Sequence, residues 1–309
     1  MRAAVLEAPR RVVLRELPPP EPARGEVRVR VRGAGICGSE LPLWQGREWF
    51  DYPREAGEPG HEGWGTVEAL GDDVSELAVG QRVTFISQRA HAEYDLTRAA
   101  HAVALPGAVA DPFPGEPLAC AVNALRRAGI EAGQRVAVVG CGFLGLLLVA
   151  LAAAEGADVV AISQRATSLE HAAGMGARQT WRLPEGGQAG EAAYDVVIEA
   201  TGHQEPLDLA ARLTRVRGRL VIAGYHQDGL RTVDMQLWNW RGLDVVNAHE
   251  RDPDVYATGL REAVGIVAAG RLDLAPLLTH QYALDELGEA YGVCIERPPG
   301  FVKAVWRDG

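Results

Sequence analysis

The sequence predicts an α/β protein with two domains, one rich in β-structure and one built on a doubly wound parallel sheet. Two patterns along the chain predict it. Up to about residue 110, short alternating segments are separated by frequent glycines and prolines, and beyond residue 117 buried strand patterns alternate with helical ones. With 309 residues, of which 47% are hydrophobic, the chain can bury two substantial cores. We expect a cleft between the domains, where ligands tend to bind.

The N-terminal part has the pattern of a small barrel-like β domain. Residues 26–32 alternate polar and apolar side chains with a period of two, which predicts a half-buried strand. Residues 66–70, which precede a Gly-Asp turn, and residues 81–86 predict two more strands. The Pro-rich residues 17–22 predict an extended connector.

The later part alternates helices and strands, as a parallel sheet requires. We expect helices over 118–128 and 145–155, and strands over 135–139, 158–162, 194–199 and 219–223. The last 40 or so residues return to mixed character and end in a strand-like segment, 301–306. The sequence therefore predicts a first domain of residues 1–117 and 266–309 and an inserted domain of residues 118–265.

Charge and cysteine usage argue against several function classes. The net charge of −10 disfavours nucleic acid or an anionic membrane as a partner. Residues 143–154, the most apolar stretch, are too short to span a bilayer, and the N-terminus lacks a secretion signal. The four cysteines are scattered and form no C-x-x-C pair, so we expect reduced thiols in a cytoplasmic protein.

A glycine fingerprint predicts a dinucleotide site. The sequence Gly-Cys-Gly-Phe-Leu-Gly directly follows a predicted strand and opens a predicted helix, whose N-terminal amides would face a pyrophosphate. The first glycine would allow the tight turn, the second the approach of the phosphates, and the third close helix packing. The alternative is a glycine-rich turn of another kind of α/β protein. The expected cofactor-binding residues here are Gly140, Gly142, Phe143, Leu144 and Gly145.

The end of the second strand of this domain predicts which dinucleotide binds. An acidic residue there would bind the ribose 2′-hydroxyl of NAD, but the chain has Ser163, Gln164 and Arg165. Arg165 can pair with a 2′-phosphate through its planar guanidinium, and Ser163 can donate a hydrogen bond. We therefore expect NADP(H) in preference to NAD(H). The alternative is that Arg165 is a solvated loop cation and that cofactor choice is loose.

The ligand types of a catalytic zinc occur close together in the N-terminal part. Cys37 lies in a glycine-rich turn, His61 and Glu62 follow Gly60, and Glu116 lies near the domain junction. Thiolate, imidazole and carboxylate all bind Zn²⁺, and a catalytic zinc usually takes three protein ligands. Taken singly, Cys37 is more typical of a small buried residue and His61 of an ordinary histidine. The cysteine clusters of a structural zinc are absent, so we expect one catalytic zinc only.

Six motifs, in an order that spans nearly the whole chain, carry a family resemblance: residues 35–40, 60–63, 80–83, 116–118, 140–145 and 200–202. Through these motifs the chain resembles the medium-chain dehydrogenase/reductase superfamily. Within that superfamily it is similar to the zinc-dependent alcohol and polyol branch, which contains the sorbitol and threonine dehydrogenases. The resemblance implies a GroES-like catalytic domain, a Rossmann domain, and a homodimer through the edge of the Rossmann sheet, for which residues 243–247 are our candidate. It also implies that Cys37 and His61 bind zinc, with Glu62 and Glu116 beside them and Thr201 near the cofactor. Which carboxylate binds the metal stays open.

The chain departs from the family pattern at three places. Residues 84–94 are short and lack the structural-zinc lobe that many relatives carry there, which leaves the catalytic ligands untouched. Glu40 stands where relatives have aspartate, and it could orient His61 with a longer reach or only make a local turn contact. Pro42 replaces a relay histidine, so a proton would leave through Ser39, a cofactor ribose hydroxyl or water.

Together these features predict reversible oxidation of an alcohol to a ketone or aldehyde, with zinc as a Lewis acid and NADP(H) as the hydride carrier. Ser39 would accept the hydroxyl proton, and Glu40 and Glu62 would act beside the metal. The alternatives are a zinc-free quinone or enone reductase of the same fold and a non-catalytic NADPH-binding protein. Four aromatic residues could line the substrate pocket or could pack under their loop: Trp44, Trp49, Phe50 and Tyr52.

Overall fold

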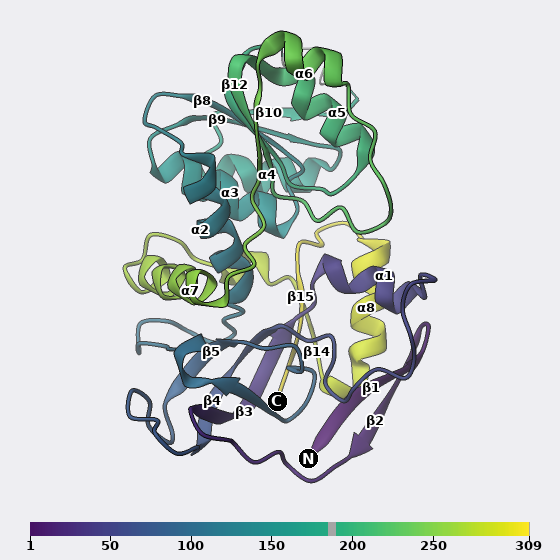
Figure 1. Ribbon diagram of the computed structural model, residues 1–309, viewed down its shortest axis with the longest axis vertical. Coiled ribbons are helices and arrows are strands. Elements are labelled where there is room, and N and C mark those ends of the chain that lie inside the picture. The colour runs from purple at the N-terminus through teal and green to yellow at the C-terminus, as the bar shows by residue number, and fades with distance from the viewer. Residues whose placement is uncertain (185–189, 309) are drawn as a thin grey trace. The chain divides into compact units, whose positions relative to one another are not determined.

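The structure, a computed structural model, describes residues 1–184 and 190–308. Two compact units make up the chain, the first containing Met1–Ala119 and Asp252–Gly309 and the second Cys120–Arg251 (Figure 1). Each unit has a sheet of its own, mixed in the first and parallel in the second. The predicted α/β fold class, with one β-rich part and one doubly wound part, is therefore confirmed.

The first unit is built on a seven-stranded sheet in the order β14-β15-β3-β4-β5-β7, with β6 also paired to β3, and on a separate hairpin of β1 and β2. β3 keeps the expected alternation, since Val27, Val29 and Val31 are buried while the arginines between them are more exposed. The strand bounds are β1 Arg2–Ala8, β2 Arg11–Glu16, β3 Glu26–Gly35, β4 Glu62–Leu70, β5 Arg82–Ile86, β6 Tyr94–Arg98, β7 Ala102–Ala104, β14 His280–Tyr282 and β15 Ala304–Arg307.

The last strand begins later than the expected segment at 301–306. The N–H groups of Val302 and Lys303 donate to Thr279 Oγ1, at 3.0 and 3.4 Å, instead of joining a ladder. β15 therefore begins at Ala304, where it pairs with β14 and β3. This arrangement buries Lys303 directly in front of the strand.

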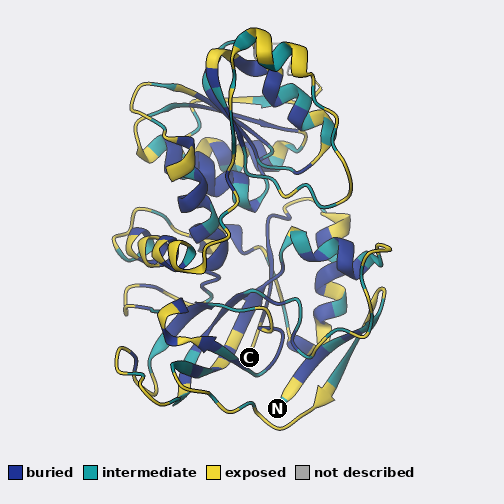
Figure 2. Ribbon diagram, viewed as in Figure 1, coloured by how far each residue is buried: buried dark blue, intermediate teal, exposed yellow. Residues whose placement is uncertain are grey.

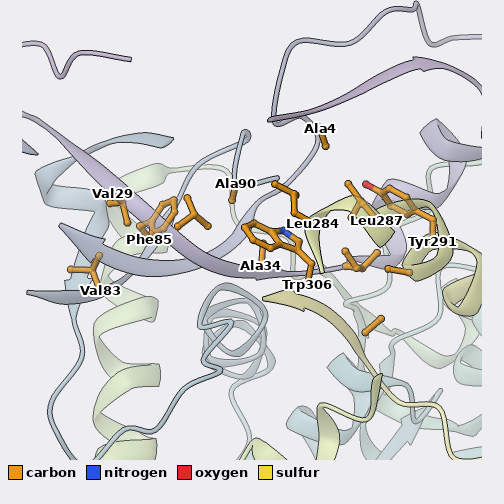
Figure 3. Packing of buried hydrophobic residues seen from close by; sticks show 14 of the residues in the cluster. Ala4, Val29, Ala34, Val83, Phe85, Ala90, Leu284, Leu287, Tyr291 and Trp306 are labelled. Carbon is orange, nitrogen blue, oxygen red and sulfur yellow. The ribbon is translucent and has the colours of Figure 1, made fainter. Parts of the chain in front are cut away.

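Helices and short turns complete the first unit. The hydrophobic core gathers on the sheet and on α8, where Phe85, Tyr291 and Trp306 are almost completely buried (Figure 3). Each aromatic side chain of this kind buries on the order of 150–250 Å², which contributes several kcal/mol. The elements are α1 Leu41–Gln45, α7 Pro253–Ala268, α8 Leu287–Glu296, and the 3-10 turns η1 Gly38–Glu40, η2 Ala99–His101, η4 Ala275–Leu277 and η5 Leu284–Glu286.

Helix α7 packs on the first unit. The Asp252 side chain caps it by accepting the N–H groups of Asp254 and Val255, at 2.9 and 3.3 Å. Arg261 donates to the carbonyl of Ala100 in η2, at 3.1 Å. The chain thus returns to the first unit at Asp252, whereas the sequence pattern placed the return at 266, because helical periodicity alone does not show which sheet a helix covers.

The second unit is a parallel sheet in the order β10-β9-β8-β11-β12-β13. Numbered from the first strand of the unit this is 3-2-1-4-5-6, the order of doubly wound dinucleotide-binding folds. Its central strands are buried (Figure 2). The elements are α2 Glu116–Ala128, which starts in the first unit, β8 Arg135–Val139, α3 Phe143–Ala154, β9 Asp158–Ser163, α4 Ala166–Gly174, β10 Gln179–Arg182, β11 Tyr194–Glu199, α5 Gln204–Leu213, β12 Thr214–Ile222, α6 Met235–Arg241 and β13 Asp244–Asn247.

Within residues 1–184 and 190–308, no helix is both long enough and apolar enough to cross a bilayer.

Candidate metal centre and dinucleotide site

The end of β3 and the start of β4 bring the predicted metal ligands together. Gly35 at the end of β3 is paired in register with Glu62 at the start of β4. Cys37 lies just beyond β3, at the N-terminus of η1, and His61 lies just before β4. One ligand atom from each of Cys37, His61 and Glu62 lies within 4.8 Å of the other two. Adjacent strand ends thus account for the cluster.

The two carboxylate oxygens of Glu62 have different surroundings. Oε1 accepts a hydrogen bond from Lys303 Nζ at 2.5 Å, and both side chains are buried. Oε2 is buried and has no hydrogen-bond partner. A Cβ atom at Gly35 would lie 1.9 Å from this oxygen, so only glycine leaves room for the carboxylate. Gly35, two residues before Cys37, is therefore required by the site.

The donor set fits Zn²⁺. A thiolate, an imidazole and a carboxylate oxygen that lacks a partner are three ligands of the types that zinc prefers, which is the number usual in catalytic sites. A buried, unpaired carboxylate oxygen is costly unless a cation or donor satisfies it. Lys303 already neutralises the other oxygen. Burial lowers the pKa of Lys303, but Glu62 and Cys37 raise it by more, so the net shift is upward and the ammonium stays charged.

The ring of His61 is held by its Nδ1 atom. Nδ1 lies 2.9 Å from the carbonyl oxygen of Pro59 and 3.3 Å from Glu40 Oε1, so both neighbours are acceptors. Nδ1 therefore carries the proton and Nε2 is the nitrogen left with a lone pair. Burial lowers the pKa of His61, but the Cys37 thiolate, Glu116 and Glu40 together raise it well above its ordinary value. The surroundings thus favour positive charge at this imidazole or beside it.

Glu116 lies near the cluster and outside the group of three. It opens α2, is 8% exposed, and accepts a hydrogen bond from the hydroxyl of Tyr256 in α7. Burial raises its pKa, although His61 lowers it in part. Glu116 is thus within electrostatic reach of His61, while the oxygen that lies with Cys37 and His61 belongs to Glu62.

The turn after Cys37 carries the other predicted catalytic residues. Ser39 is half-buried in η1, and Glu40 closes that turn with its carboxylate buried. Burial raises the pKa of Glu40, but His91, His61 and Tyr291 together hold it below its ordinary value. Glu40 therefore makes specific contacts with His61 and with core residues, which go beyond a local turn contact.

The aromatic residues between the metal motifs have different surroundings. Trp44 is 7% exposed and stacks on Tyr291, with ring centroids 4.9 Å apart. The Tyr52 hydroxyl donates to the carbonyl of Leu43. Trp49 is 49% exposed. Core packing thus accounts for Trp44, and Trp49 is the residue of this group most available to a ligand.

The glycine fingerprint lies where the sequence placed it. Gly140 follows β8 with φ of +98°, and Gly142 is the residue before α3. A Cβ atom at Gly145 would lie 1.8 Å from the carbonyl oxygen of Gly140, so the first turn of α3 packs directly on the loop. Phe143 is buried and Leu144 is partly exposed in that turn. The N-terminus of α3 directly follows this loop, and helix N-termini are general binding sites for phosphate groups.

The residues predicted to select the dinucleotide lie at the end of β9. Ser163 is its last residue, Gln164 is exposed, and Arg165 is partly exposed in front of α4. The Arg165 N–H donates to Ser163 Oγ at 3.4 Å. These three residues occupy the carboxyl end of the second strand, which is where the 2′ position of an adenosine ribose is read in this fold.

Thr201 is held by a buried carboxylate at the end of β11. Glu199 is completely buried, and its Oε1 accepts the N–H groups of Thr201 and Gly202, at 2.6 and 3.0 Å, and the Thr201 hydroxyl. Its Oε2 accepts from His226 Nε2 at 3.0 Å, and Arg231 Nε donates to His226 Nδ1 at 2.8 Å. This network fixes the loops that follow β11 and β12.

Sequence reasoning missed the residues that support both sites. Apart from Glu199, which lies two residues before Thr201, they lie far along the chain from the residues that they contact, and no local pattern marks them. They are His91, Glu199, His226, Tyr256, Tyr291, Lys303 and Trp306.

Comparison with known proteins matches both units. Residues 23–116 match the alcohol dehydrogenase GroES-like domain, and residues 144–264 match the zinc-binding dehydrogenase family. The erythritol/L-threitol dehydrogenase of Mycolicibacterium smegmatis is 30% identical, over 93% of this chain and 92% of its own. The L-galactonate-5-dehydrogenase of Escherichia coli is 26% identical over 94% of each chain. A crystal structure assigned as a zinc-binding dehydrogenase of Sinorhizobium meliloti, bound to NADP, aligns with a TM-score of 0.86 at 27% identity over 99% of each chain.

Proposed function

The chain belongs to the medium-chain dehydrogenase/reductase superfamily, and from this membership we propose that it is a zinc-dependent oxidoreductase that interconverts an alcohol and a ketone or aldehyde with NADP(H). The observation that carries the proposal is the buried Glu62 Oε2, which has no hydrogen-bond partner and lies with the ligand atoms of Cys37 and His61. The names of the two relatives described above indicate that they act on a sugar acid and on polyols. This supports a small hydroxylated substrate for the present chain.

Three residues would hold the metal. Zinc bound by Cys37, His61 and Glu62 would supply a Lewis acid that lowers the pKa of a substrate hydroxyl. His61 offers its Nε2 lone pair because Nδ1 is occupied by two acceptors. Lys303 holds Glu62 Oε1 and leaves Oε2 to the metal. Glu116 would stay beside the ligands, where its carboxylate accepts a hydrogen bond from the Tyr256 hydroxyl.

Ser39 is the proposed proton acceptor. It lies two residues after Cys37, on the turn that also carries Glu40, and a serine hydroxyl can accept one proton while it passes on another. Glu40 acts on the reaction by holding His61. No step needs a histidine at Pro42.

The second unit would bind the dinucleotide. The fingerprint loop at 140–145 would receive the pyrophosphate at the N-terminus of α3. Thr201, fixed by Glu199, would contact the nicotinamide half, because it follows β11 on the second half of the sheet. Ser163, Gln164 and Arg165 favour NADP(H), since no carboxylate there opposes a 2′-phosphate.

Metal analysis and an activity panel test the function together. We expect about one zinc per chain in protein purified without chelator, and hydride transfer in a panel of alcohols and ketones assayed with NADP⁺ and NAD⁺ in parallel. Cys37→Ala should lose the zinc and at least about 100-fold in kcat/KM, because the Lewis acid is gone. Cys120→Ala, a cysteine in α2, is the matched control and should keep both. Activity that survives Cys37→Ala would refute the zinc mechanism, and a zinc-free wild type that reduces enones would support the alternative reductase.

The choice of carboxylate is tested by two isosteric variants. Glu62→Gln should weaken zinc binding about 10-fold or more, since a charged ligand is lost. Glu116→Gln should change zinc affinity less, because its oxygen lies outside the group of three. Competition with a chromogenic chelator measures both affinities, and the reverse order would assign the metal to Glu116.

A further inference from the structure

We propose that His91 and Tyr291 are positioning residues of the metal centre: they fix the Glu40 carboxylate against His61, so that the imidazole presents its Nε2 lone pair to the metal. This inference rests on the proposed function. It concerns two core residues that no motif marks, one following β5 and one in α8.

One oxygen of Glu40 is held by two donors. Glu40 Oε2 accepts from His91 Nε2 at 3.1 Å and from the Tyr291 hydroxyl at 2.8 Å. The three side chains are buried, and His91 is completely inaccessible. Tyr291 is in turn stacked on Trp44 and meets the ring of His91 edge-on, with centroids 6.2 Å apart. Aromatic packing thus fixes both donors.

Trp306 fixes the tautomer of His91. The Trp306 Nε1–H group can only donate, and it lies 3.0 Å from His91 Nδ1. Nδ1 must therefore accept, and the ring proton of the neutral imidazole is on Nε2, where it points to Glu40. The direction of every hydrogen bond from Trp306 through His91 to Glu40 is set by this one indole.

The other oxygen of Glu40 faces the metal ligand. Oε1 is buried without a hydrogen-bond partner and lies 3.3 Å from His61 Nδ1. The carboxylate cannot turn toward another partner, because its second oxygen is held by His91 and Tyr291. A carboxylate behind a ligating histidine orients the ring and makes it a stronger ligand.

The charge of Glu40 also favours a metal ion beside His61. His91, with its one ring proton on Nε2, and Tyr291 are both neutral donors. The buried Glu40 carboxylate therefore lacks a cationic partner among these two residues, and an uncompensated buried charge is costly. A cation bound at His61 Nε2 would offset this charge through the ring. Glu40 and the metal would then stabilise each other, and the two donors would set how closely Glu40 approaches His61.

The test uses the full chain and three variants. Tyr291→Phe removes one donor and keeps the ring, and His91→Leu removes the other. His91→Gln keeps an amide N–H for Glu40 and a carbonyl for Trp306. We expect zinc affinity to fall about 10- to 100-fold in Tyr291→Phe and His91→Leu and to recover substantially in His91→Gln. The visible absorption of the cobalt(II)-substituted protein should shift in the first two variants, because the His61 ligand moves.

Tyr282→Phe is the matched control, because it also removes a tyrosine hydroxyl beside this core and should change neither readout. Unchanged affinity and an unchanged cobalt spectrum in Tyr291→Phe and His91→Leu would overturn the inference while leaving the proposed function intact. Equal loss in His91→Gln and His91→Leu would also overturn it. Failure of the wild-type protein to bind zinc or cobalt would instead refute the proposed function.

Discussion

Lys303 and Glu62 form a buried ion pair whose two halves depend on each other. Their Nζ and Oε1 atoms are 2.5 Å apart, and neither side chain is more than 6% exposed. Removal of one partner leaves a buried charge without compensation, which typically costs about 3–5 kcal/mol. We therefore expect Lys303→Met to lower the free energy of unfolding of the metal-free protein by that amount, as measured by urea unfolding with a chelator present.

The double variant Lys303→Met/Glu62→Gln is the control for this prediction. Replacing both partners removes the uncompensated charge, so most of the lost stability should return. Added zinc should stabilise Lys303→Met, which still carries Glu62, and should stabilise the double variant less. A double variant that is as unstable as Lys303→Met would show that the lysine stabilises the fold by packing rather than by charge.

Asp95 makes stability depend on pH. It lies in β6, is 4% exposed, and has one oxygen without a hydrogen-bond partner. Burial raises its pKa from 3.8 to about 6. Between these values the folded chain binds more protons than the unfolded chain, so the free energy of unfolding falls as pH rises from about 4 to 6.

Asp95→Asn should remove this dependence. At pH 7 it should stabilise the protein by up to about 3 kcal/mol, the free energy that corresponds to the shift, and at pH 4 it should have little effect. Urea unfolding at pH 4, 5, 6 and 7 measures the difference, with the exposed Asp72→Asn as control. A variant that is equally or less stable than wild type at pH 7 would contradict the assignment.

At the residue level, the sequence identified the candidate metal ligands better than the residues that support them. Cys37, His61 and Glu62 could be found because ligand types beside glycines are visible in short motifs, and the structure brings all three together. Lys303 lies 241 residues from Glu62. Such a partner is specified only by the tertiary fold, so no local pattern could reveal it.

At the level of elements, periodicity predicted most strands and helices because each presents one regular face to a core. It predicted β3, β8, β9 and α3 within a few residues. It placed β15 too early, because the Thr279 hydroxyl takes two N–H groups that would otherwise begin the strand. Competition of this kind between a side chain and a ladder depends on a distant residue.

The junction of β9 and α4 is the element that should select the cofactor. Arg165 precedes α4, and its guanidinium is the expected partner of a 2′-phosphate. A charge-assisted hydrogen bond contributes about 1.5–3 kcal/mol, so Arg165→Ala should raise KM for NADPH about 10- to 100-fold and change KM for NADH little. Steady-state kinetics with both cofactors measures this.

Arg178→Ala is the control for the cofactor prediction. Arg178 is a 75% exposed arginine of the same unit, and its pair with Asp158 is long, at 3.9 Å. It should leave both KM values unchanged. Equal changes of KM for NADPH and NADH in Arg165→Ala would mean that the arginine does not read the 2′ position.

At the scale of the molecule, the class of each sheet could be predicted, because alternating strands and helices allow few topologies. The pairing of β15 with β3 could not, since it joins the two ends of the chain over more than 200 residues. Nor does a single sequence show which surfaces are left uncovered. The structure locates one around the outer strand β13, which pairs only with β12 within the described residues.

That surface leads to a prediction about assembly. Leu230 is fully exposed, Trp240 in α6 is 88% exposed and Met235 is 52% exposed, all shortly before β13. Exposed apolar side chains next to an unpaired strand edge are typical of an interface, because both would otherwise promote aggregation. We therefore expect a homodimer formed through β13 and α6, with a mass in light scattering twice the 33.1 kDa of one chain.

Two charge substitutions test where the dimer forms. Met235→Glu/Trp240→Glu should shift the protein to monomer at micromolar concentration, because buried carboxylates without partners oppose association. Val79→Glu, which charges a 63% exposed apolar residue of the first unit, is the control and should remain dimeric. A wild-type monomer would refute the dimer, and a double variant that stays dimeric would place the interface elsewhere. Zinc content should be unchanged in all three proteins, because the proposed ligands come from the other unit.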